Sequence, residues 1–208
     1  MSNPFLEIPL DIYEKHMSLE TVQQLPILNR IMKKQLYSYK VNRVMILGIA
    51  GGNGLEHIET QKIDRVYGVD INDGYLETCR QRYPDLSGHF ETVCADLNNK
   101  KVNLPKAELV IANLFVEYIG YDAFVHHMKK ISPKYISVVI QINEQDGFVS
   151  ESPYIHAFDR VPEVHHQMEE KELSDVLAGI GYVKLYREEI PLPNGKKFIQ
   201  TDYEIIED

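Results

Sequence analysis

Four glycines and an alanine gather within seven residues, directly after a run of apolar residues. Residues 44–58 have the sequence VMILGIAGGNGLEHI, with Gly48, Ala50, Gly51, Gly52 and Gly54 at its centre. Glycine has no Cβ atom, so other atoms can come close to its backbone and positive φ is accessible. A tight turn would need one or two glycines. Four within seven residues favour a backbone that approaches a ligand.

Two phosphate-binding motifs fit this segment poorly. An ATP-type phosphate loop needs Gly-Lys-Ser/Thr, whereas Leu55 and Glu56 follow Gly54. A dinucleotide fingerprint G-x-G-x-x-G that begins at Gly48 would place Ala50 and Asn53 at its second and third glycines. The glycines therefore serve neither of these motifs in its usual form.

Acidic residues end the next two predicted strands. Asp70 closes YGVD about 20 residues beyond the glycines, where an acid can accept hydrogen bonds from both hydroxyls of a ribose. Alternatively, Asp70 or Asn72 could cap the helix that follows. Asp96 closes CAD, where a carboxylate or a neighbouring backbone N–H could meet an adenine. Taken alone, Asp96 fits a surface or capping residue equally well.

An alternation of short apolar strands and helical segments positions these residues. The predicted strands are residues 44–48, 65–70, 89–96, 107–114 and 134–142. The predicted helices are residues 53–61, 72–83 and 121–131. This rhythm predicts an α/β fold with a parallel sheet and helices on both faces. Ligands of such sheets bind outside the carboxyl ends of the strands.

The two ends of the chain depart from this rhythm. Two strand candidates, residues 181–192 and 196–206, flank Pro193-Asn194-Gly195, which predicts an antiparallel hairpin. Near the start, residues 14–25 and 27–39 are helix-like, with Ser18 and Thr21 as alternative N-caps. Residues 143–169 form a long polar and aromatic loop, which is usually functional or disordered. It leaves from a strand's carboxyl end, so it can reach the site.

Together these features resemble the class I S-adenosylmethionine-dependent methyltransferases. In that family the first strand ends in a pattern like V-L-D-L-G-x-G-x-G, and here residues 44–52 are VMILGIAGG. The resemblance continues through GVDIN, CADL and NLFVEYIG, residues 68–72, 94–97 and 113–120. The motif LGxAGGNG is similar to that of uncharacterised bacterial methyltransferase-like proteins. The resemblance covers about residues 41–142 and the hairpin.

The resemblance implies a Rossmann-like, seven-stranded, mostly parallel sheet in a single domain with S-adenosylmethionine as cofactor. The domain would consist of an N-terminal helical cap (1–40), a cofactor-binding core (41–142), a substrate-side loop or insertion (143–169) and a C-terminal helix and hairpin (170–208). The glycines would admit the methionine portion and ribose, Asp70 would hold the ribose, and Asp96 with Leu97 would border the adenine. The cofactor-binding residues would be Gly48, Ala50, Gly51, Gly52, Asn53, Asp70, Ile71, Asp96, Leu97, Asn113, Leu114 and Phe115.

Two residues depart from the family's first motif. Ile46 stands where an acid often supports the amino-acid end of the cofactor, and Ala50 replaces the middle glycine. Asn53 or Glu56 would then take over the polar contacts.

Methyl transfer requires alignment of nucleophile, methyl carbon and sulfur, and exclusion of water. Aromatic rings stabilise a positive sulfur, and Phe115 and Tyr118 follow the fourth strand directly. Phe115 could equally pack into the core. If the acceptor carries a proton, a base is needed, and the pool is Glu117, Tyr13, His16, Tyr154 and His156. The catalytic candidates are thus Tyr118, Glu117, Tyr13 and His16.

Composition narrows the acceptor and the partners. The chain has 208 residues, 44% of them hydrophobic, and a net charge of −9, which disfavours nucleic acid. An Asn/Asp-Pro-Pro-Tyr/Phe signature for base methylation is absent from the fourth strand, where Asn113 begins NLFV. The adjacent pairs His126-His127 and His165-His166 lack the i, i+4 spacing of metal ligands, so no metal is expected. We expect a small-molecule methyl acceptor.

Other classes remain open at this point. They are a non-catalytic nucleotide-binding protein that kept the fold, a spermidine-synthase-like aminopropyltransferase and an NAD-dependent oxidoreductase. Two cysteines, no signal-peptide pattern and no apolar run of membrane-spanning length predict a soluble, cytoplasmic protein. The oligomeric state is open, with a homodimer as one possibility.

Overall fold

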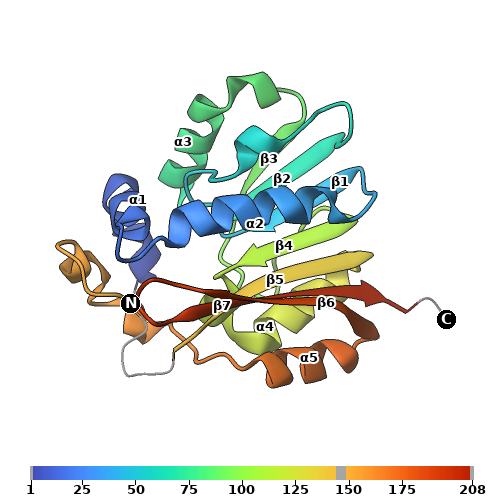
Figure 1. Cartoon of the computed structure of the whole chain (residues 1–208). Coiled ribbons are helices and arrows are strands. Elements are labelled where there is room, and N and C mark those ends of the chain that lie inside the picture. Colours follow the sequence, from blue (N-terminus) through green and yellow to red (C-terminus); the bar gives the residue numbers. More distant parts are fainter. Residues whose placement is uncertain (1, 144–148, 207–208) are drawn as a thin grey trace.

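A single seven-stranded sheet forms the centre of the computed structural model, which describes residues 2–143 and 149–206 (Figure 1). The strand order is β3-β2-β1-β4-β5-β7-β6. The strands are β1 (Arg43–Leu47), β2 (Arg65–Asp70), β3 (Phe90–Cys94), β4 (Leu109–Asn113), β5 (Tyr135–Ile142), β6 (Tyr182–Pro191) and β7 (Lys197–Ile205). β1 to β5 pair in parallel, and β7 is antiparallel to both of its neighbours. The predicted fold class and C-terminal hairpin are confirmed.

Apolar residues on both faces of the central strands explain why helices cover both sides. Met45 and Val110 face the helices α4 (Val116–Ile131) and α5 (Glu170–Ala178). Ile46 and Ile111, one position further along their strands, face α2 (Gln24–Ser38) and α3 (Asp73–Arg82). Side chains alternate between the two faces of a strand, so each of these strands contributes to two cores.

Short elements from both sides of the long predicted loop gather at the carboxyl ends of the parallel strands. Figure 1 shows α1 (Leu10–Ser18) and the orange segment with η4 (Ile155–Phe158) and η5 (Val161–Glu163) at the end toward which β4 points. Part of the predicted 143–169 loop, residues 144–148, lies outside the described residues. The chain before β1 and the chain after β5 therefore both reach this end of the sheet.

Several predicted helix boundaries are wrong. Residues 53–61 form only the 3-10 turn η2 (Leu55–His57), because Gly54 has φ +96° and Ile58 is already extended. The helix predicted at 121–131 begins at Val116, with a non-helical break at Gly120 (φ 70°, ψ 168°). The helix predicted at 14–25 ends at Ser18.

The start of the next helix also differs from the prediction. α2 begins at Gln24, after Gln23 in the left-handed conformation. Ser18 ends the preceding helix and Thr21 lies in the connection, so neither caps α2.

Candidate functional site

A cleft of about 670 Å³, open solvent at its mouth included, adjoins Gly48 and Ala50, and we call it the β1–β4 cleft. It lies beyond the carboxyl ends of β1, β2 and β4. Nine of the twelve predicted cofactor residues line it: Gly48, Ala50, Asp70, Ile71, Asp96, Leu97, Asn113, Leu114 and Phe115. The fold thus brings together residues that are up to 67 positions apart in sequence, from Gly48 to Phe115.

The turn after β1 is held by β2. The N–H groups of Gly48 and Ile49 donate to the carbonyl of Val69 at 2.8 and 3.2 Å. The next N–H, that of Ala50, donates to Asp70 Oδ2 at 2.9 Å. Ala50 has φ +47°, a conformation that is costly for a residue with a Cβ atom. The carboxylate of Asp70 therefore fixes a strained turn at the edge of the cleft.

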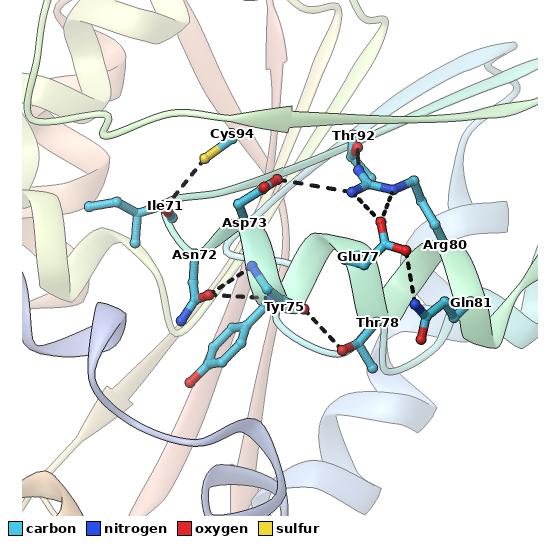
Figure 2. Close-up of polar contacts among 11 residues, drawn as sticks. Ile71, Asn72, Asp73, Tyr75, Glu77, Thr78, Arg80, Gln81, Thr92 and Cys94 are labelled. Atoms are coloured by element: carbon cyan, nitrogen blue, oxygen red, sulfur yellow. Dashed lines mark hydrogen bonds and ion pairs between the residues drawn. The ribbon is translucent and has the colours of Figure 1, made fainter.

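Asp70 is 8% exposed and borders the cleft. Its Oδ1 accepts from the N–H of Asn72 at 2.9 Å, so each oxygen has one backbone donor and keeps lone pairs for a ligand. Burial raises the pKa of this carboxyl, although the backbone donors oppose the shift. Asp70 does not cap α3. Asn72 caps it, as Figure 2 shows, with Oδ1 accepting from the N–H groups of Gly74 and Tyr75.

The glycines after Ala50 admit protein side chains. A Cβ atom on Gly52 would lie 2.7 Å from the ring of Tyr83 and 2.9 Å from Leu55. A Cβ atom on Gly54 would lie 2.5 Å from Met32. Gly52 lies buried against α3 and η2 and does not line the cleft, so its predicted cofactor contact stays a prediction.

Gly51 and Asn53 line a different space, a cavity of about 530 Å³ behind the turn, which we call the turn cavity. It shares Tyr13, Gly48, Ala50 and Asn113 with the β1–β4 cleft.

An ion pair that sequence reasoning missed lies beside the turn cavity. Glu14 of α1 bonds Arg82 of α3, with Arg82 Nη2 2.9 Å from Glu14 Oε2, and Arg82 also donates to the carbonyl of Gly51 at 3.1 Å. Glu14 lines the turn cavity. Asn53 and Glu56, the predicted polar substitutes for an acid at position 46, both bond the side chain of Asn29 instead. No local sequence signal marks Glu14, because its partner is 68 residues away.

The end of β4 supplies a second strained residue. Leu114 has φ +51° and its N–H donates to the carbonyl of Val139 at 2.8 Å. Asn113 exchanges two hydrogen bonds of 2.8 Å with the amide of Gln35. The half-buried ring of Phe115 lies against Gly48, where an added Cβ would come within 2.5 Å of it. Phe115 thus lines the cleft and also packs against the core, which joins its two predicted roles.

The N-terminal segment covers one side of the cleft. Tyr75 Oη donates to the carbonyl of Ile8 at 2.6 Å, and Asn72 Nδ2 donates to the carbonyl of Phe5 at 2.9 Å. Figure 2 shows Tyr75 directed from α3 toward this segment. Phe5 contacts Tyr118 edge-on, with ring centroids 4.7 Å apart. These contacts add Phe5, which sequence reasoning did not assign, to an aromatic wall for which Tyr118 was already a candidate.

A second pocket, of about 580 Å³ with open solvent included, adjoins the cleft and is here named the Glu117 pocket. The two spaces share the lining residues Phe5, Tyr13, Leu114 and Tyr118. Glu117 is 3% exposed, and its Oε1 accepts from the N–H of Gln141 at 3.0 Å. Its Oε2 has no hydrogen-bond partner among the described residues. Burial raises the pKa of Glu117 to about 7.

The four predicted catalytic residues all line the Glu117 pocket. Burial raises the pKa of Tyr13 and Tyr118, and the charge of Glu117 adds to both shifts. His16 is buried beside Phe158, accepts or donates at Ser152 Oγ over 2.7 Å, and has its pKa lowered by burial. Of these four residues, Glu117 is the base candidate whose pKa is brought close to neutral pH by burial.

The rest of the base pool lies elsewhere. The His156 side chain is 90% exposed and pairs with Asp159, and neither His156 nor Tyr154 lines the cleft or the Glu117 pocket. His126 and His127 bond the carbonyls of Lys100 and Leu97. Within residues 2–143 and 149–206, no group of three or more His, Cys, Asp or Glu side chains could hold a metal ion. No helix in the same part of the chain is long and apolar enough to cross a membrane.

Comparisons with known proteins agree with this geometry. Residues 46–132 match a family model described as a methyltransferase domain. The N-methyltransferase NodS from Bradyrhizobium japonicum WM9, in complex with S-adenosylhomocysteine, is 12% identical with a TM-score of 0.65, over 99% of this chain and 100% of that chain. Magnesium protoporphyrin IX methyltransferase (ChlM) from Synechocystis PCC 6803, with bound S-adenosylmethionine, is 11% identical with a TM-score of 0.64, over 98% of each chain.

The cyclase SpnF shares the fold as well, at 10% identity and a TM-score of 0.66, over 88% of this chain and 82% of that chain. A comparison with curated protein sequences gave no significant match. Residues 46–132 thus match a methyltransferase domain, and the chain shares its fold with solved methyltransferases, which supports the resemblance to the class I S-adenosylmethionine-dependent methyltransferases.

Proposed function

We propose that this protein transfers the methyl group of S-adenosylmethionine to a small molecule. The observation that supports this most is the pair of adjoining spaces with a common wall of Phe5, Tyr13, Leu114 and Tyr118. One space has the residues for a nucleoside, and the other has a buried carboxyl for an acceptor. Two reactants bound in adjoining spaces that share these lining residues would meet in line and away from water.

The residues of the β1–β4 cleft fit the cofactor. Asp70 has a spare lone pair on each oxygen and faces the cleft, so it would accept from the ribose hydroxyls. Asp96 and Leu97 would border the adenine, and Gly48 and Ala50 would bring the backbone close to the methionine portion. When bound, the cofactor supplies a methyl group on a positively charged sulfur.

Glu14 and Arg82 would take the place of the acid that the family often has at position 46, where this chain has isoleucine. The amino-acid end of the cofactor carries an ammonium and a carboxylate, and this ion pair offers both complementary charges beside Gly51. Ile46 itself is 3% exposed, packs in the core against α2 and α3, and lines the turn cavity with an apolar side chain that offers no charge.

The Glu117 pocket supports a small acceptor. It is enclosed by α1, the N-terminal segment and residues 149–161, through Phe5, Val149, Phe158 and Val161. This enclosure, together with the net charge of −9, makes nucleic acid a poor acceptor.

Cytoplasmic location and a possible homodimer stay predictions. Cys79 is buried and Cys94 exposed, and both are free thiols.

A second function, binding or catalysis without methyl transfer, is supported by the likeness to the cyclase SpnF, since one fold serves more than one chemistry. Aminopropyl transfer has weaker support because Asn113, at the end of β4, is neutral and paired with Gln35.

Isothermal titration calorimetry with S-adenosylhomocysteine, NADH and decarboxylated S-adenosylmethionine would test the proposal. We expect micromolar binding of S-adenosylhomocysteine and much weaker binding of the other two. Preference for NADH would contradict the proposal, and preference for decarboxylated S-adenosylmethionine would favour aminopropyl transfer. Binding of S-adenosylhomocysteine without turnover of any acceptor would favour the second function.

A further inference from the structure

We propose that the Glu117 pocket takes a small amine, and that Glu117 binds the ammonium form and then removes the proton that blocks its nitrogen. The proposal rests on the function proposed above and names the class of its acceptor. It is carried by an unpaired buried carboxyl oxygen that faces an aromatic pocket beside the β1–β4 cleft.

Glu117 lies in an unusual environment for a carboxyl group. Fully buried carboxyl groups are rare without a cationic or hydrogen-bonding partner on each oxygen. Here Oε1 has the N–H of Gln141, whereas Oε2 has no partner among the described residues, and Glu117 forms no ion pair with any of them. The described residues thus leave one carboxyl oxygen for a ligand that donates a hydrogen bond.

Aromatic rings line the Glu117 pocket. Phe5 and Tyr118 meet edge-on at 4.7 Å, and Tyr118 lies 6.1 Å from His165. The rings of Tyr13 and Phe158, which also line the pocket, have centroids 6.5 Å apart. Aromatic faces attract a cation, most strongly where water is excluded. Aromatic rings and a carboxyl in one pocket are complementary to an ammonium group.

Among the described residues that line the pocket, the remaining ionisable groups leave Glu117 as the one with a charge near neutral pH. Burial holds Tyr13 and Tyr118 neutral by raising their pKa, and it lowers the pKa of His16 and His165. Lys196 donates to Ser150 Oγ at 3.3 Å, and its charge acts on the two histidines but contributes nothing to the shift of Glu117. An anionic acceptor would meet the carboxylate without a compensating cation at that end of the pocket.

The proton and electron balance of the reaction suits a carboxyl of this kind. Glu117 carboxylate takes one proton from R–NH₃⁺, which gives R–NH₂ and neutral Glu117. The nitrogen lone pair then forms the N–CH₃ bond, while the electrons of the C–S bond return to sulfur. The products are the N-methylammonium and S-adenosylhomocysteine, and Glu117 releases the proton to solvent as the site opens. A buried pair favours this proton transfer, because neutral amine and neutral acid cost less to bury than two ions.

Three probes of similar shape test the assignment: benzylamine, benzyl alcohol and benzoate. Each is titrated into the protein saturated with S-adenosylhomocysteine, for the wild type, Glu117→Gln and Glu172→Gln. Glu172 is an exposed acid on α5, so its variant matches the loss of charge away from the pocket. Methylation of benzylamine with S-adenosylmethionine is followed by mass spectrometry.

We expect benzylamine to bind more tightly than benzyl alcohol, and benzoate to bind most weakly. Glu117→Gln should weaken benzylamine at least about thirtyfold, abolish N-methylation and leave S-adenosylhomocysteine binding unchanged. Glu172→Gln should behave as the wild type. Benzyl alcohol binding as well as benzylamine, no benzylamine binding beside bound S-adenosylhomocysteine, or an indifferent Glu117→Gln variant would each overturn the amine assignment. Failure of S-adenosylhomocysteine itself to bind would instead overturn the proposed function.

Discussion

Replacing Glu117 by glutamine should change the stability of the protein in a pH-dependent way. The stability of the variant minus that of the wild type should be larger at high pH than at low pH. Glutamine keeps the shape of the side chain and the acceptor for the N–H of Gln141, but it cannot ionise. Glu117 is 3% exposed and its Oε2 has no partner among the described residues, so its ionised form is costly in the folded state.

The magnitude follows from the pKa of Glu117, which burial raises from 4.5 to about 7. Each unit corresponds to about 1.4 kcal/mol, so the full effect is about 3 kcal/mol. The folded state binds the proton more tightly than the unfolded state. The stabilisation by protonated Glu117 is therefore complete below pH 4.5 and is lost as the pH rises through 7.

Urea unfolding at several values between pH 4.5 and pH 8 would measure this effect. The free energy of unfolding of Glu117→Gln minus that of the wild type should rise by about 3 kcal/mol across this range. Tyr13 and Tyr118, which also feel the charge of Glu117, titrate above the range. Glu172→Gln should follow the wild type. A constant difference between Glu117→Gln and the wild type would refute the raised pKa, and with it the account of the unpaired carboxyl.

Three further predictions concern the turn and Asp70. Gly52→Ala and Gly88→Ala both place a Cβ at φ +85°, but only the Cβ at position 52 would meet other atoms within 4 Å. In urea unfolding, Gly52→Ala should therefore lose about 1–3 kcal/mol more stability than Gly88→Ala, and equal losses would contradict the packing role of Gly52. Ala50→Gly should stabilise the protein by about 1 kcal/mol in the same assay because it relieves a left-handed alanine, and a loss of stability would argue against that strain. Asp70→Ala should weaken S-adenosylhomocysteine at least about tenfold by calorimetry, whereas the exposed control Asp73→Ala should not; unchanged affinity in Asp70→Ala would remove Asp70 from the ribose site.

The sheet could be predicted from the sequence because each strand carries its own signal. Buried parallel strands are short apolar runs, and those at Arg43–Leu47 and Leu109–Asn113 are bounded by polar or glycine-rich turns. The hairpin could be predicted from Asn194-Gly195, which lies between β6 and β7 as expected.

The helix after the glycines could not be judged correctly from residue types alone. Residues 53–61 have helix-forming character, but Gly54 at φ +96° and contacts such as the bond from Asn53 Nδ2 to the carbonyl of Leu25 set the backbone. Tertiary contacts of this kind override local propensity. The same reason explains Gly52, whose lack of a Cβ atom serves Tyr83 and Leu55.

The site residues at strand ends could be predicted from the sequence. The site residues that the packing of distant elements brings together could not. Asp70 and Asn113 end their strands and therefore line the cleft. The Glu14–Arg82 pair joins α1 to α3 over 68 residues, and no local pattern shows it. The sequence also could not show the burial of Glu117. An acid in the first turn of a helix is usually exposed and favoured by the helix dipole, whereas here β5, α1 and the N-terminal segment enclose it.

A crystal structure of the protein with S-adenosylhomocysteine would test the central claim most directly. The account predicts ribose hydroxyls within hydrogen-bond distance of Asp70, adenine beside Asp96 and Leu97, and the sulfur at the wall of Leu114 and Tyr118 that leads to the Glu117 pocket. A ligand bound outside the β1–β4 cleft, or one whose sulfur faces away from the Glu117 pocket, would contradict it.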